Sequence, residues 1–301
     1  MTGMLTRHSA TATGIGLTVA AMACFATLDT TTKFVSIGVP IFMALWFRYA
    51  FQALATTLVV LPLRGLKVLH TAHPKFQVLR GALLLASSVF AFFSLKFMPV
   101  GEFTAIVMLT PLVITLLAST ALGERVSALR WALVCGGFAG TLVIIRPGHD
   151  AFEWTALLPL GLVISNSWFQ VLTSKLAKTE DPVTMHLYTG WIGALLASVP
   201  LPWAWEMLPD SKLWGWLVLM GAAATVGHFL LILAYQRAPA STLTPYLYAQ
   251  IGFAMLGGWI AFAHIPDNWS IAGMLMIAIC GAAGAWLALR GSPQMIKPVE
   301  T

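Results

Sequence analysis

The segment SLKFMPVGEFT at residues 94–104 has a counterpart in the segment AYQRAPASTLT at residues 234–244, which lies 140 positions later. Each segment reads as the end of one helix, a turn that contains a proline, and the start of a new helix. With one residue inserted near Pro266, residues 132–140 match residues 273–281 at an offset of 141. The pattern therefore predicts that one structural unit occurs twice in the chain.

Long apolar runs lie on both sides of these turns and fill most of the 301 residues. Hydrophobic residues make up 58% of the chain and charged residues only 9%, whereas a soluble domain carries about 25% charged residues. A helix of about 20 apolar residues crosses a bilayer, and continuous apolar runs differ from the alternating pattern of a membrane β-barrel. The sequence therefore predicts an all-α integral membrane protein with ten transmembrane helices, at about residues 12–33, 40–63, 76–97, 102–121, 128–146, 155–175, 183–205, 213–235, 240–263 and 269–289.

The ten predicted helices divide into two sets of five, one for each copy of the unit. We expect residues 1–150 to form the first five-helix repeat, residues 151–290 the second, and residues 291–301 a tail. Because five is odd, the second copy must cross the membrane in the opposite direction, so the two repeats are inverted. Inverted repeats are typical of secondary transporters, in which they let one fold open to either side of the membrane.

Lysine and arginine are distributed unevenly between alternate connections of this topology. With the N-terminus inside, twelve of them, Arg80 included, fall on the inner side and four on the outer side, while Arg48 lies within a span. Cytoplasmic loops of membrane proteins carry an excess of these residues. Both termini are therefore expected in the cytoplasm.

Several classes of function lack the residues that they need. The three cysteines, Cys24, Cys135 and Cys280, are far apart and odd in number, so they form neither a disulfide framework nor a CxxC metal site. The net charge of +6 has too little extramembrane surface around it to form a nucleic-acid interface. No P-loop, HExxH or GxSxG motif occurs. We therefore expect no catalytic residue, no metal, no cofactor and no nucleic-acid partner.

The motifs around the first turn resemble a known family. Residues 93–105 (FSLKFMPVGEFTA), 109–112 (LTPL) and 123–126 (GERV), with Trp131 and Gly136, are similar to the EamA repeat of the drug/metabolite transporter superfamily. The second copy keeps AYQRAPA at 234–240 but has Ala263 and His264 where the family usually has Gly-Glu. The resemblance covers nearly the whole chain.

This resemblance implies a ten-helix secondary transporter of the bacterial inner membrane. It extends to the YddG-type exporters, which export amino acids or related metabolites. It also implies a central cavity lined by the first, third, fourth, sixth, eighth and ninth helices, and the departure at His264 puts any role of a second-copy acidic residue in doubt.

Polar side chains inside apolar spans are the main sign of a transport pathway, because each is costly in lipid unless it faces protein or water. In the sixth predicted helix, Asn166 and Gln170 share a face, whereas Trp168 lies on a different one. His228 lies within the eighth. These residues are predicted to contact a polar solute; the alternative is that they hydrogen-bond neighbouring helices or simply pack.

The ninth predicted helix carries the stretch that we favour for substrate contact. Tyr246 and Gln250 share a face there, and Tyr248 lies between them. The tyrosines could equally belong to an interfacial aromatic belt, but Gln250 is too deep for that alternative. Met108, in the fourth predicted helix, is expected to form a softer, less polar part of the wall. Phe25 and Ser88 are weaker substrate candidates, because stripes of Met and Phe in their helices are more often packing.

Three ionisable side chains within spans have competing interpretations. Asp29 and His228 are candidates for proton coupling, although Asp29 could instead pair with Lys33, four residues on. Arg48 could bind a carboxylate, or form a structural or lipid-headgroup contact. We favour the structural interpretation for Arg48, because the second helix is not among the cavity helices that the resemblance implies.

Small residues predict one close helix contact. Gly136 and Gly140 form a GxxxG motif in the fifth predicted helix, and Gly281 with Ala285 is the equivalent in the tenth. Such spacing lets two helices approach closely. The motif predicts either packing of these two helices or a homodimer contact, so the protein is expected to be a monomer or a homodimer.

Taken with the resemblance, these features favour a transporter that exports small metabolites, amino acids first, by alternating access. The alternative within transport is a carrier of drugs or sugar-linked metabolites with the same fold. A membrane scaffold or enzyme is a more distant alternative, since the candidate residues are scattered and no nucleophile, base and acid converge.

Overall fold

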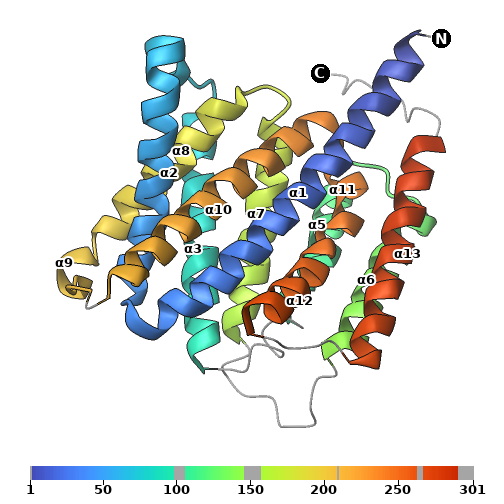
Figure 1. Cartoon of the computed structure of the whole chain (residues 1–301). Coiled ribbons are helices and arrows are strands. Elements are labelled where there is room, and N and C mark those ends of the chain that lie inside the picture. Colours follow the sequence, from blue (N-terminus) through green and yellow to red (C-terminus); the bar gives the residue numbers. More distant parts are fainter. Residues whose placement is uncertain (1, 98–105, 146–156, 209, 263–266, 291–301) are drawn as a thin grey trace.

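The computed structural model describes residues 2–97, 106–145, 157–208, 210–262 and 267–290, and regular structure in these ranges is entirely helical (Figure 1). Residues 98–105 and 263–266, which carry part of the paired motif and include His264, lie outside the described residues. The helices are α1 (Thr2–Gly38), α2 (Ile41–Arg64), η1 (Gly65–Leu69), α3 (Pro74–Phe97), α5 (Thr110–Thr120), α6 (Ala128–Ile145), α7 (Leu157–Leu176), α8 (Pro182–Ser198), α9 (Leu201–Ala204), α10 (Ser211–Arg237), α11 (Ala240–Leu247), α12 (Ala249–Phe262) and α13 (Asn268–Arg290).

Each predicted span overlaps helical structure in the described ranges. Five helices, α1, α2, α3, α7 and α10, are long and apolar enough to cross a membrane, and shorter apolar helices lie within α5, α6 and α13. In lipid a backbone must satisfy its own hydrogen bonds, which favours helices for such sequences. The all-α membrane fold agrees with the prediction, while the number of ten crossings stays a prediction.

One backbone turn in each half of the chain interrupts the helical structure at related positions. One turn is at Met108 and Leu109, just before α5, and the other is at Tyr248, between α11 and α12. Met108 and Tyr248 are 140 residues apart, the same offset that relates the two sequence segments. The two turns touch, because the Tyr248 hydroxyl donates a hydrogen bond of 3.5 Å to the Met108 carbonyl oxygen.

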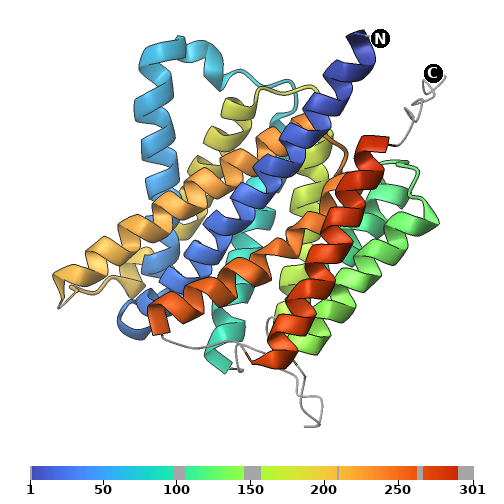
Figure 2. The ribbon, with the colours of Figure 1, turned by 45° about the vertical axis from the view of Figure 1, so that its right-hand side comes forward.

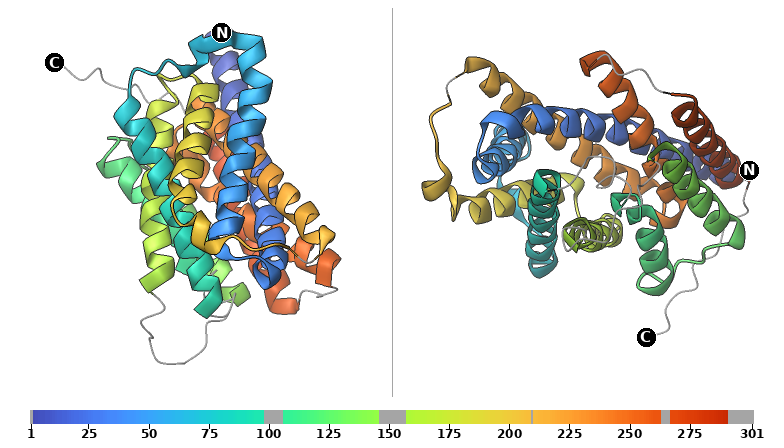
Figure 3. Two further views of the ribbon diagram at one scale, coloured as in Figure 1. Left: turned by 90° about the vertical axis from the view of Figure 1, so that its left-hand side faces the viewer. Right: turned by 90° about the horizontal axis from the view of Figure 1, so that it is seen from below.

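The helices pack in pairs that join the two halves of the chain. The most extensive contacts are those of α1 with α10, α6 with α13, α2 with α8, and α3 with α7. Seen along the helices, α6 and α13 occupy one end of the cross-section and α2 and α9 the other (Figure 3). The beginning of α1 and the end of α13 lie at the same end of the molecule (Figures 1 and 2).

Glycines let α6 and α13 approach closely. A Cβ atom on Gly140 would lie 2.9 Å from the carbonyl oxygen of Gly273, and one on Gly136 would lie 2.7 Å from the Sγ atom of Cys280. Gly281, the small residue expected at this contact, has no atom within 4 Å of a Cβ position. The GxxxG motif thus packs two helices of one chain, and Gly273 is the glycine that it meets.

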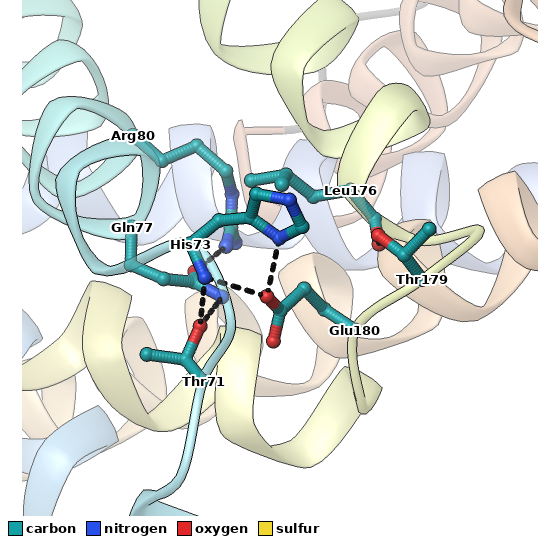
Figure 4. Close-up of polar contacts among 7 residues, drawn as sticks. All are labelled: Thr71, His73, Gln77, Arg80, Leu176, Thr179 and Glu180. Carbon is teal, nitrogen blue, oxygen red and sulfur yellow. Dashed lines mark hydrogen bonds and ion pairs between the residues drawn. The ribbon is translucent and has the colours of Figure 1, made fainter.

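A buried arginine joins α3, α7 and α8; Figure 4 shows it beside Gln77 of its own helix. Arg80 is fully buried and was counted above with the inner-side charges, but it lies inside α3. Its guanidinium donates to the hydroxyls of Thr173 and Thr189, at 2.9 and 2.8 Å, to the side-chain oxygen of Gln77 at 2.8 Å and to the Met185 carbonyl at 3.2 Å. Four acceptors from three helices satisfy a charge that would otherwise be costly to bury.

The connection before α8 is fixed beside this arginine. Glu180 accepts hydrogen bonds from the backbone N–H of His73 at 3.0 Å and from its ring Nδ1 at 2.8 Å (Figure 4). Asp181 caps α8 by accepting from the backbone N–H groups of Val183 and Thr184. These contacts tie the start of α3 to the turn between α7 and α8.

Candidate functional site

A cavity at the centre of the molecule is lined by residues from α1, α2, α3, α5, α7, α10, α11 and α12 and by the turn before α5. Its empty space is about 910 Å³, which includes the open solvent at its mouth. The apolar part of the wall includes Met22, Phe25, Met108 and Phe169. The polar part of the wall consists of Asp29, Arg48, Ser87, Ser88, Thr110, Asn166, Gln170, His228 and Gln250.

Asp29 of α1 and Gln250 of α12 form one polar group of the wall. The amide nitrogen of Gln250 donates a hydrogen bond of 2.6 Å to Oδ2 of Asp29. Asp29 is exposed to the solvent in the cavity. The predicted pairing with Lys33 lies outside the described side chains. A carboxylate that faces water across a cavity is able to bind a cationic group or a proton.

A second polar group extends from α7 to α10. The amide nitrogen of Gln170 donates to the side-chain oxygen of Asn166 at 2.7 Å, and the amide oxygen of Gln170 accepts from the Tyr235 hydroxyl at 2.7 Å. This series of hydrogen bonds orients both amides, because the amide nitrogen of Gln170 must donate to Asn166 while its amide oxygen accepts from Tyr235. The amide oxygen of Asn166 is the acceptor in this contact, and Asn166 lines the cavity.

The third polar group is centred on Arg48 of α2. Its Nη1 donates to the Ser88 hydroxyl at 2.8 Å, and its Nη2 lies 3.0 Å from Nε2 of His228. The Tyr49 hydroxyl lies 2.9 Å from the same Ser88 oxygen. Phe25 packs against the His228 ring with centroids 4.7 Å apart. The premise that the second helix lies away from the cavity was wrong, because α2 contributes Arg48 to the cavity wall.

Three predicted site residues lie away from this cavity. Trp168 is 41% exposed and does not line it. Tyr248 is fully buried and holds the Met108 carbonyl. Tyr246 lines a separate, apolar pocket between α1, α11, α12 and α13. The remaining predicted residues line the cavity together: Phe25, Asp29, Ser88, Met108, Asn166, Gln170, His228 and Gln250.

Sequence reasoning missed part of the wall. Phe169 and Leu84 are apolar residues within apolar runs, so the sequence alone does not distinguish them from packing residues. Ser87 and Thr110 are small hydroxyl residues, which commonly bond to their own helix. Arg48 had a signal, namely its depth inside an apolar run, and it was set aside only because of the helix that carries it.

Within the described ranges, no group of three or more His, Cys, Asp or Glu side chains is arranged to hold a metal ion. The polar wall of the cavity consists of amides, hydroxyls, His228 and the oppositely charged side chains of Asp29 and Arg48. Polar groups that face a cavity inside a helical membrane fold are a feature of membrane transporters.

The model of the EamA-like transporter family matches residues 12–146. This match agrees with the family resemblance predicted from the sequence. A riboflavin transporter of Brucella anthropi is 28% identical over 83% of this chain and 90% of its own length. An S-adenosylmethionine uptake transporter of Rickettsia conorii is 25% identical over 88% of this chain and 90% of its own.

A pseudopaline exporter of Pseudomonas aeruginosa is 24% identical over 88% of this chain and 93% of its own. A solved crystal structure matches 93% of this chain and 98% of its own with a TM-score of 0.78 and 20% identity, which shows the fold alone. Relatives named for uptake and for export are thus both similar to this chain over most of its length.

Proposed function

We propose that this protein is a secondary transporter that carries amino acids or closely related metabolites across the bacterial inner membrane by alternating access of the central cavity. The observation that carries the proposal is the origin of the polar wall, which comes from both halves of the chain. Asp29, Arg48 and Ser88 belong to the first half, and Asn166 and His228 to the second. Movement of one half against the other would therefore open this wall to one side at a time.

The packing pairs support two inverted repeats at residues 1–150 and 151–290. When the halves are aligned by their sequence segments, α1 corresponds to α7 and α3 to α10. Swapping each helix for its counterpart in the other half then turns the pair α1–α10 into the pair α7–α3, and both pairs are among the extensive contacts. The pairs α2–α8 and α6–α13 each exchange with themselves. This is the pattern expected of a two-fold relation between repeats. The excess of lysine and arginine on one side of the predicted topology supports a cytoplasmic position for both termini and for the tail at residues 291–301.

The chemistry of the wall supports an amino-acid substrate. A zwitterion needs an acceptor for its ammonium group and donors for its carboxylate, and the cavity holds the Asp29 carboxylate and the Arg48 guanidinium without a salt bridge between them. Phe25, Met108 and Phe169 supply an apolar surface for a side chain. Asp29 and His228 were the two candidates for proton coupling, and we propose Asp29. A proton added to Nε2 of His228 would break the contact of this atom with Arg48, so His228 is the less suitable carrier.

The test is flux in proteoliposomes loaded with labelled amino acids, measured in both directions with and without an imposed pH gradient. Saturable flux is expected in wild-type protein. Gln250→Ala and Asn166→Ala should each reduce it by about fivefold, the effect of about one hydrogen bond. Trp168→Ala is the matched control on α7 and should leave flux unchanged, since Trp168 is outside the cavity.

Two results would count against the proposal. If folded, inserted protein showed no flux above empty liposomes for any amino acid, the substrate class would be wrong, and drugs or sugar-linked metabolites would be tested next. If Trp168→Ala impaired flux as much as Asn166→Ala, the assignment of the pathway to this cavity would fail. Gradient dependence that disappears in Asp29→Asn would support proton coupling.

A further inference from the structure

Arg48 carries a buried positive charge that no carboxylate contacts among the residues that the structure describes. Only 8% of the residue is exposed, and its described hydrogen-bond partners, Ser88 and His228, are uncharged groups. Its Nε–H is buried without a partner. A buried cation of this kind is costly unless an anion compensates it, and Arg48 lies in the wall of a solvent-connected cavity.

The hydrogen bond to His228 determines where the proton of that ring lies. A guanidinium only donates, so Nε2 of His228 must accept, and the ring proton must be on Nδ1. That Nδ1 atom is also buried without a partner. Two buried donors without a partner, Nε–H of Arg48 and Nδ1–H of His228, therefore lie in side chains that contact each other in the wall of this cavity.

We propose that Arg48 and His228 form a subsite for the carboxylate group of the transported solute, a proposal that rests on the proposed function and specifies its substrate as a monoanionic or zwitterionic acid. A planar guanidinium with a free Nε–H matches a carboxylate through paired hydrogen bonds. Ser88 and Tyr49 act as positioning residues, because the Ser88 hydroxyl accepts from the guanidinium and the Tyr49 hydroxyl in turn contacts the Ser88 oxygen.

Charge in the cavity favours a carboxylate over a phosphate dianion. Asp29 lines the same cavity and lies near enough to Arg48 for their charges to interact, yet it forms no salt bridge with Arg48. A dianion would be repelled by Asp29 and would face only one guanidinium. A solute with one carboxylate, and with a cationic or polar group toward Asp29 and Gln250, meets both ends of the wall.

The first experiment measures binding without transport. Purified full-length protein is heated with sodium benzoate or with benzamide, a neutral molecule of the same shape, at one ionic strength set with sodium chloride. Benzoate should stabilise wild-type protein and benzamide should not. Arg48→Gln should lose this difference. Arg48→Lys keeps the charge but not the planar fork, and should bind benzoate about tenfold more weakly.

Arg64→Gln is the matched control, because Arg64 is an exposed arginine of the same helix that pairs with Asp181. It should respond to benzoate as wild-type protein does. Equal stabilisation of wild-type protein by benzoate and benzamide, or an unchanged benzoate response in both folded Arg48 variants, would overturn the proposal. Since this assay needs no flux, it decides the subsite even if no amino acid is transported.

The second experiment separates the subsite from the proposed function. Competition against labelled amino-acid flux should require about tenfold more of an amino-acid amide than of the free acid in wild-type protein, and equal concentrations in Arg48→Lys. Wild-type flux that acids and amides inhibit equally would leave the transport function intact and overturn the carboxylate subsite.

Discussion

Replacing Arg80 by methionine should destabilise the protein more than any exposed arginine replacement does. Arg80 makes four hydrogen bonds within 3.2 Å to uncharged acceptors on α3, α7 and α8, and it is fully buried. Bonds from a charged donor contribute about 1.5–3 kcal/mol each, while burying the guanidinium costs several kcal/mol. The net loss expected on replacement is about 3 kcal/mol.

The assay is unfolding of the purified protein in mixed detergent micelles, followed by the fluorescence of its 12 tryptophans. Arg64→Met is the control, since the Arg64 side chain is 55% exposed in its pair with Asp181 and a surface pair contributes about 1 kcal/mol or less. Arg80→Lys should fall between the two, because one ammonium cannot reach all four acceptors. Equal stability of Arg80→Met and Arg64→Met would refute the assignment of Arg80 as a structural link.

Two further predictions concern packing and pH. Gly137→Ala should destabilise the protein by about 1–3 kcal/mol, because the new Cβ would lie 2.6 Å from the Tyr248 ring, whereas Gly252→Ala has nothing within 4 Å and should not; equal unfolding free energies would contradict this. Burial raises the pKa of Glu180, but hydrogen bonds from His73 and Thr71 together lower this pKa by more than burial raises it. The pKa of Glu180 therefore lies below its ordinary value of 4.5. The resulting stability is fully present above pH 4.5 and is lost as pH falls through the folded-state pKa; Glu180→Gln should flatten this part of the acid unfolding curve, and an unchanged curve would show that the contact is not stabilising.

The fold followed from the sequence because membrane insertion limits the choices. Continuous apolar runs must become helices in lipid, and the segment at 234–244 located the turn between α10 and α11. The turn predicted in the segment at 94–104 lies outside the described residues. The interruption at Tyr248 was not foreseen. Pro245 signalled a weak point, but the break occurs three residues later, where the Tyr248 ring packs over Gly137 and its hydroxyl reaches the Met108 carbonyl.

The candidate site was predicted where a polar residue stands out from an apolar background. Asn166, Gln170, His228 and Gln250 were found in this way, and all line the cavity. Trp168, Tyr246 and Tyr248 are amphipathic, so composition alone does not tell whether they face a cavity, lipid or another helix. Arg48 was the opposite case. Its charge within an apolar run indicated a site residue, but its helix was not expected to line the cavity. The packing of α2 against α8 and α10 is what places Arg48 in the cavity wall.

The most direct measurement of alternating access is two-sided labelling of one cysteine in the cavity. Cys24, Cys135 and Cys280 are replaced, and a single cysteine is introduced at Asn166 or, as the control, at Trp168. A membrane-impermeant thiol reagent is then applied to inside-out or right-side-out vesicles. A cysteine at 166 should react from both sides and be protected by substrate from both, whereas one at 168 should show no substrate protection. Reaction at 166 from one side only, in protein that transports, would contradict alternating access through this cavity.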